Sequence, residues 1–139
     1  MSSEAAEPRL TVLIYSDDAN VRASVRAALG RRPAVDVPFL DYIECATEPM
    51  VIRYLDKGGL DLVILDGEAV PSGGMGIARR MKTEIFNAPP ALLLTGRPQD
   101  AWLATWSQAE AVVPHPIDPV LLAQAAAALL RPPAALTGR

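Results

Sequence analysis

Five short, mostly apolar segments alternate along the chain with amphipathic stretches of helical spacing, and this alternation strongly limits the possible folds. The strand-like segments are residues 10–15, 39–46, 61–65, 91–94 and 111–113. The helix-like segments are residues 18–30, 48–57, about 77–86, 99–108 and 118–130. Apolar strands that alternate with helices are typical of a parallel sheet covered on both faces. Because crossovers between parallel strands are right-handed, the pattern predicts a doubly wound α/β fold.

The composition fits one intracellular domain and excludes several classes of protein. The 139 residues suffice for one core, and we expect a domain over 9–131 with flexible tails over 1–8 and 132–139. No apolar run approaches the roughly 18 residues that span a bilayer, so membrane insertion is not expected. The polar, acidic start is unlike a signal peptide, and the single Cys45 favours a reducing cytoplasm. A net charge of −3 argues against a nucleic-acid partner.

Polar residues follow three of the predicted strands directly. Asp17 and Asp18 follow the first strand, Asp66 closes the third, and Thr95 closes the fourth. The carboxyl ends of parallel strands meet at one edge of the sheet, where open α/β folds place their sites. Carboxylates and a hydroxyl gathered at this edge predict a site for a divalent metal and a phosphoryl group.

These residues, in this order and at this spacing, resemble the receiver domain of response regulators, of the chemotaxis type. The resemblance covers roughly residues 9–131 and rests on four pieces: the acidic turn at Asp17, the strand ending in Asp66, Thr95, and the pair His115-Pro116. It implies a five-stranded sheet of flavodoxin-like order 2-1-3-4-5 with helices on both faces. It also implies an atypical, stand-alone member of two-component systems, because no second domain follows the last helix.

The resemblance assigns a role to each residue of the site. Asp66 stands where the family carries the phosphoryl-accepting aspartate, Thr95 where it carries a switch hydroxyl, and His115 where it carries a lysine. Mg²⁺ is the implied cofactor, held by the carboxylates of Asp17 and Asp66 and by the backbone carbonyl of Glu68. Asp18 is a further candidate ligand. Such sparse oxygen sites suit Mg²⁺, which keeps several of its waters.

Three positions depart from the family pattern and weaken this chemistry. Ser16 replaces the first of two adjacent acids, so Mg²⁺ should bind more weakly. His115 replaces a lysine, and an imidazole is shorter and mostly neutral at pH 7. A charge pair 4 Å apart is worth on the order of 4 kcal/mol at an effective dielectric near 20, and much of this should be lost. Val112 replaces an aromatic residue that follows the movement of the hydroxyl in many receivers.

The loop after Asp66 also departs from the family pattern, because it is one residue longer before Pro71. Together, the departures predict that phosphorylation of Asp66 is weakened or lost. At most, the chain would phosphorylate itself from a phosphodonor, so it is not expected to be an enzyme.

Structural roles remain open for each of these residues. Asp66 could simply accept backbone N–H groups at a strand end, and Asp17 and Asp18 could cap the next helix. Thr95 could be an ordinary loop hydroxyl, and His115 a rigid spacer between prolines.

We expect the output to be contact with a protein. The expected face comprises Trp102, Trp106, Val112 and the helix within 117–131, which the family uses for dimers and partners. A sensor histidine kinase and a homodimer are the implied partners.

An alternative function is that of a flavodoxin-like electron carrier or a small phosphate-ligand binder, although carboxylates after the first strand would repel a phosphate. A small hydrolase with Asp66 as nucleophile is another, but no general base is evident beside it.

Overall fold

The computed structural model describes residues 8–70, 72–85, 87–96 and 105–131 of the chain. The strands are β1 (Arg9–Tyr15), β2 (Phe39–Cys45), β3 (Leu62–Asp66), β4 (Ala91–Thr95) and β5 (Ala111–Pro114). The helices are α2 (Ala19–Leu29), α3 (Glu48–Lys57), α4 (Gly74–Glu84) and α6 (Pro119–Leu130). The predicted tails lie largely outside the described residues, as do Trp102 and most of the predicted helix 99–108.

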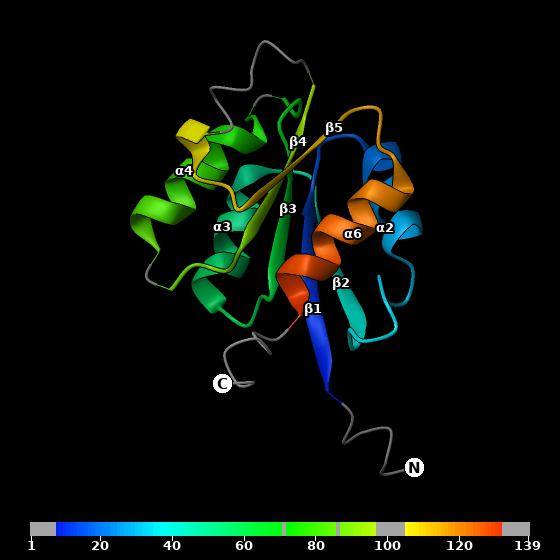
Figure 1. The fold of residues 1–139 in the computed structure, drawn as a ribbon. Helices are drawn as coiled ribbons and strands as arrows, with labels where there is room; N and C mark the ends of the chain where they lie inside the picture. The colour runs from blue at the N-terminus through cyan, green and yellow to red at the C-terminus, as the bar shows by residue number, and fades with distance from the viewer. Residues whose placement is uncertain (1–7, 71, 86, 97–104, 132–139) are drawn as a thin grey trace.

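The strands form one parallel sheet of five, in the order β2-β1-β3-β4-β5 (Figure 1). The predicted fold class and strand order are therefore confirmed. β3 and β4 pair so that Asp66 lies beside Leu94, and β4 and β5 pair so that Thr95 lies beside Pro114. This register brings the ends of the three strands to one edge of the sheet.

Helices cover both faces of the sheet and bury a separate apolar cluster on each. α2 and α6 lie on one face, and α3 and α4 lie on the other (Figure 1). The α2–α6 side includes Val25, Leu29 and Leu122, which pack on alternate residues of the strands. The α3–α4 side includes Val51 and Met81, and it also buries Cys45 as expected. Strand residues are apolar on both faces because both faces are covered.

The start of α4 differs from the prediction. The helix was predicted over about 77–86, but it begins at Gly74, so its first turn includes the glycine-rich residues 74–76. A Cβ on Gly74 would lie 2.8 Å from the backbone carbon of Asp66. Glycine is therefore needed because the helix starts directly against the end of β3, a close approach that composition alone does not reveal.

No helix in the described part of the chain is long and apolar enough to cross a membrane.

Candidate functional site

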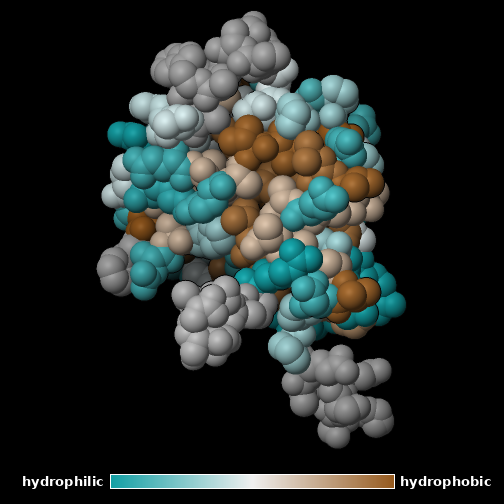
Figure 2. Space-filling model, viewed as in Figure 1, coloured by the Kyte–Doolittle hydropathy of each residue, from teal (hydrophilic) through white to brown (hydrophobic). Residues whose placement is uncertain are grey.

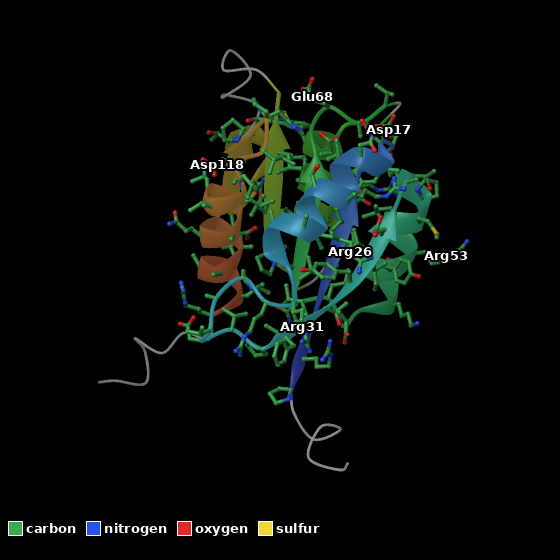
Figure 3. All side chains as sticks on the ribbon, turned by 90° about the vertical axis from the view of Figure 1, so that its right-hand side faces the viewer. Asp17, Arg26, Arg31, Arg53, Glu68 and Asp118 are labelled. Atoms are coloured by element: carbon green, nitrogen blue, oxygen red, sulfur yellow. The ribbon has the colours of Figure 1, made fainter. Side chains whose placement is uncertain are left out.

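The predicted site residues meet at the carboxyl edge of the sheet. Asp66 is the last residue of β3 and Thr95 the last of β4, while Ser16 and His115 directly follow β1 and β5. Asp17 and Glu68 lie at the same end of the molecule (Figure 3). The structure thus brings together residues that are up to 99 positions apart, through the parallel arrangement of their strands.

Asp66 is almost completely buried and is held by three neighbours. The residue is 2% exposed. The hydroxyl of Ser16 donates to Oδ2 at 2.7 Å, and the backbone N–H of Glu68 donates to Oδ1 at 2.9 Å. Nε2 of His115 lies 3.1 Å from the same Oδ1 and can donate to it when it carries a proton. Both carboxylate oxygens therefore have partners, which compensates for their burial.

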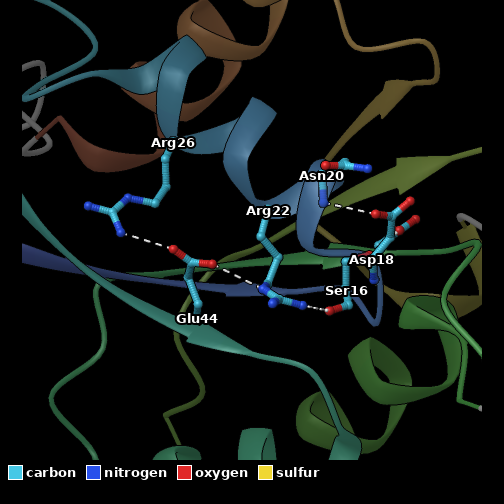
Figure 4. Close-up of polar contacts among 7 residues, drawn as sticks. Ser16, Asp18, Asn20, Arg22, Arg26 and Glu44 are labelled. Carbon is cyan, nitrogen blue, oxygen red and sulfur yellow. Dashed lines mark hydrogen bonds and ion pairs between the residues drawn. The ribbon is translucent and has the colours of Figure 1, made fainter.

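Ser16 joins the carboxylate of Asp66 to the start of α2. Its side chain is fully buried, and its Oγ accepts the backbone N–H of Asp18 at 3.0 Å while donating to Asp66. Nη1 of Arg22 donates to the carbonyl oxygen of Ser16 at 2.6 Å (Figure 4). The side chain beside Asp66 is thus an uncharged hydroxyl. A carboxylate at the same position would repel the carboxylate of Asp66.

Arg22 is itself oriented by an ion pair on β2. The carboxylate of Glu44 accepts from Nε of Arg22 at 3.0 Å and from Nη1 of Arg26 at 2.9 Å (Figure 4). The hydrogen bonds from Arg26 and then Arg22 lower the pKa of Glu44. Sequence reasoning did not identify this pair, because the contact depends on how α2 lies over β2.

Asp17 and Asp18 have distinct structural roles. Asp18 is the N-cap of α2, and its Oδ1 accepts the backbone N–H of Asn20 at 2.8 Å (Figure 4). The predicted capping role is therefore confirmed for Asp18. Oδ1 of Asp17 instead accepts the backbone N–H of Val70 at 3.2 Å, which ties the turn after β1 to the loop after β3.

Charge and burial around this edge also affect Tyr15. Its hydroxyl donates to the carbonyl of Ser72, in the loop that follows β3. Burial raises the pKa of Tyr15, and the nearby carboxylates of Asp17, Glu48 and Asp66 raise it further. The edge is therefore rich in negative charge.

The donor set does not fit a tightly held Mg²⁺. The described residues contain no group of three or more His, Cys, Asp and Glu side chains that could hold a metal ion. Of the predicted ligands, Asp66 already binds three protein donors and Asp17 binds Val70. Mg²⁺ needs near-octahedral oxygen ligands, and the uncharged Ser16 supplies no replacement charge.

Thr95 and His115 are joined through the backbone as well as by position. The N–H of His115 donates to the carbonyl oxygen of Thr95 at 2.7 Å, and this bond extends the pairing of β4 and β5 past their ends. Thr95 is mostly buried. The residue that the resemblance assigns to the lysine position is therefore held in place by β4, the strand that ends in Thr95.

The predicted contact face is apolar where the structure describes it. Trp106 and Val112 are each 43% exposed. The guanidinium of Arg79 on α4 lies 5.1 Å from the centre of the Trp106 ring, and its Nη1 donates to the Trp106 carbonyl oxygen. The contact of Arg79 with this face was not predicted, because no sequence pattern indicates that Arg79 and Trp106 lie side by side.

Comparison with known proteins identifies the family. No family model matches the chain. An uncharacterized response regulatory protein of Mycobacterium tuberculosis is 58% identical to it over 125 residues, which cover 90% of this chain and 94% of that protein.

Solved structures show the same fold at low identity. A chemotaxis response regulator of Vibrio cholerae has a TM-score of 0.71 and 19% identity, covering 88% of this chain and all (100%) of that one. The receiver domain of NtrX from Brucella abortus has a TM-score of 0.69 and 15% identity, covering 86% and 97%. The BeF3-activated DrrB receiver domain has a TM-score of 0.68 and 18% identity, covering 88% and 98%. Together with the close relative, the fold and the strand-end residues lead to one conclusion: the chain belongs to the response regulator receiver domains of two-component signalling systems.

Proposed function

We propose that this protein is an atypical receiver that acts through protein–protein contact in the cytoplasm, with weakened or absent phosphorylation of Asp66. The observation that carries the proposal is the environment of that carboxylate. Both of its oxygens already bind protein donors, from Ser16, Glu68 and His115. A carboxylate attacks phosphorus only when it is accessible and when the phosphoryl oxygens are neutralised. At this edge, the carboxylate of Asp66 is poorly accessible, and the surrounding residues offer little positive charge to neutralise phosphoryl oxygens.

The proposed roles of the site residues follow from this geometry. Asp66 is the residue that would attack a phosphodonor, and its three protein contacts leave one lone pair, on Oδ2 beside the hydroxyl of Ser16. Thr95, at the end of the adjacent strand, would be the hydroxyl that follows the phosphoryl group. His115 would contribute positive charge only in its protonated form.

Receivers typically bind Mg²⁺ at the phosphorylation site, where the ion neutralises phosphoryl charge. For this chain we propose only weak binding, through the carboxylates of Asp17 and Asp66 and the carbonyl of Glu68, with Asp18 nearby. Asp18 is a poorer candidate because its carboxylate caps α2.

Titration with Mg²⁺ and then beryllofluoride, followed by the fluorescence of Trp102 and Trp106, tests this proposal. Intact-mass analysis after acetyl phosphate would accompany it. We expect a weak or absent fluorescence response and little or no phosphoryl adduct. Rapid, complete formation of an adduct that is lost in Asp66→Asn would contradict the proposal and identify a fully competent receiver.

The proposed contact surface is the face formed by β5 and α6. Response regulator receivers interact with histidine kinases and can form dimers. Hydrophobic residues gather here over the end of β5 and the first turns of α6 (Figure 2). Val120 is 65% exposed and Leu121 is 42% exposed, beside the exposed Val112. No charged residue occurs from Pro119 to Leu130, which is unusual for a helix at a protein surface. Exposed apolar patches of this kind mark interaction sites.

A pair of charge substitutions tests whether this face mediates self-association. Val120→Lys and Leu121→Lys together place two charges on exposed positions, so the fold should be retained. We expect any dimer of the wild-type protein to dissociate in sedimentation velocity experiments. Met50→Lys, an exposed apolar position on α3, is the matched control. Dimerisation that the double variant retains would exclude this face as the dimer contact.

A further inference from the structure

The carboxylate of Glu68 lies directly against Gly96, at the turn that follows β4. A Cβ added to Gly96 would lie 2.1 Å from Cδ of Glu68 and 2.2 Å from Oε2. The side chain of Glu68 therefore occupies the space that any other residue at position 96 would fill. This contact joins the loop after β3 to the loop after β4.

The position of Glu68 is set by the acceptor aspartate itself. Its backbone N–H donates to Oδ1 of Asp66, and this bond fixes the residue two positions after the strand end. Its side chain then extends to the end of the adjacent strand, at the edge where Asp17 also lies (Figure 3).

Glu68 is exposed, and it also lines the pocket that contains Asp66. Asp66 lies in an open pocket of about 330 Å³ that is lined by Asp17, Asp18, Val21, Asp66, Glu68 and His115. Four of these six residues carry a carboxyl group, and His115 is the one titratable base among them. Phosphodonors such as acetyl phosphate are anions, so each carboxylate at the opening opposes their entry.

We propose that Glu68 is a specificity-determining residue: its carboxylate, held over Gly96 at the opening of the Asp66 pocket, excludes anionic phosphodonors from Asp66. This inference rests on the proposed function, because it names one cause of the weakened chemistry. Two effects act together. The side chain fills the space beside the Thr95–Gly96 turn, and its negative charge repels an incoming anion. The effect of Glu68 differs from that of Ser16 and His115, because it acts on access to Asp66 and leaves the hydrogen bonds to the Asp66 carboxylate unchanged.

Inorganic phosphate is a suitable probe, since it has the charge of a donor but cannot react. Binding would be followed by the amide resonances of Gly96 and Glu68 in NMR titrations at constant ionic strength. The variants are Glu68→Ala, which removes both the volume and the charge, and Glu68→Gln, which removes the charge alone. Asp56→Asn removes one exposed negative charge from α3, far from the pocket, and serves as the matched control.

We expect Glu68→Ala to bind phosphate with an affinity on the order of tenfold or more above that of the wild-type protein. Glu68→Gln should lie between the two, and Asp56→Asn should match the wild type. Raising the salt concentration should narrow the difference between wild type and Glu68→Gln, because salt screens the repulsion. A merely structural role of Glu68 would not produce this salt dependence.

Two results would overturn the inference: equal phosphate affinity in the wild type and Glu68→Ala, or saturable binding in none of the proteins. Acetyl phosphate labelling of the same variants separates this inference from the proposed function. Rapid labelling of the wild-type protein by this anionic donor would contradict both the proposed function and the exclusion by Glu68, whereas slow labelling would leave the proposed function standing. The comparison of phosphate affinities would judge the role of Glu68 on its own.

Discussion

At the scale of single residues, the hydrogen bonds of Ser16 hold the carboxylate of Asp66 in place. Its hydroxyl satisfies Oδ2 of the buried Asp66 and also accepts the N–H of Asp18. Leaving a buried acceptor without its partner costs about 1–3 kcal/mol. We therefore expect Ser16→Ala to lower the free energy of unfolding by about this amount, measured by urea denaturation.

Ser24 provides the control for this measurement. It is exposed on α2, where replacement of serine by alanine should have little effect or slightly stabilise the helix. Equal stability of Ser16→Ala and the wild type would mean that the hydroxyl is not needed to hold the Asp66 carboxylate.

Cys45 should be protected from thiol reagents. It is buried at the end of β2, and burial raises its thiol pKa from 9.0 to about 11. The folded protein should therefore react with Ellman's reagent far more slowly at pH 8 than the urea-unfolded protein.

The raised pKa of Cys45 also makes the stability of the fold depend on pH. Because the folded state holds its proton to higher pH, this group stabilises the fold below about pH 9, and the contribution falls as pH rises towards 11. Rapid labelling of the native protein at pH 8 would contradict the buried placement.

The sequence predicted the positions of Asp66 and Thr95 better than it predicted the contacts around them. Strand ends are predictable because apolar runs stop at a polar residue, and this placed Asp66 and Thr95 correctly at the ends of β3 and β4. The hydrogen bonds of Ser16 and His115 to Asp66, and the contact of Glu68 with Gly96, depend on side-chain directions between segments distant in sequence. No local pattern encodes those directions.

At the scale of elements, the two glycines at the start of α4 should respond in opposite ways to alanine. A Cβ on Gly74 would lie 2.8 Å from the backbone of Asp66, whereas a Cβ on Gly76 would meet no atom within 4 Å. Overpacking against backbone typically costs about 1–3 kcal/mol. Alanine in an exposed helical position is favoured over glycine by up to about 1 kcal/mol. We therefore expect Gly74→Ala to lower the melting temperature and Gly76→Ala to raise it.

Thermal unfolding followed by circular dichroism would measure both variants. Destabilisation of similar size in both would mean that the close approach of α4 to β3 does not determine the need for glycine.

Element boundaries were predictable where a cap or a breaker marks them. Asp118 begins the predicted helix segment 118–130 and is the N-cap of α6, where its Oδ1 accepts the N–H of Val120 at 2.9 Å. Gly58 directly follows the predicted helix segment 48–57 and ends α3 with a positive φ of 83°. The start of α4 was not predictable in this way, because a run of glycines is locally compatible with a turn and with a helix.

At the scale of the whole molecule, the strand order was predictable from the resemblance and the alternating pattern. β3 and β4 are buried along their whole length and β1 is buried from Val12 to Tyr15, whereas β5 has an exposed residue, Val112. Native-state hydrogen exchange should therefore be slowest in β1, β3 and β4 and faster in β5. Faster exchange in β3 than in β5 would contradict the expectation that burial sets the order of protection.

The short final strand has a consequence for how the protein can assemble. β5 lies at one edge of the sheet, covers only Ala111–Pro114, and ends in a proline that has no N–H to offer a neighbouring strand. Short edge strands and edge prolines discourage the addition of another strand from a second molecule. Two molecules can therefore associate reversibly through side chains at this edge. Pairing of their strands into one continuous, growing sheet is disfavoured.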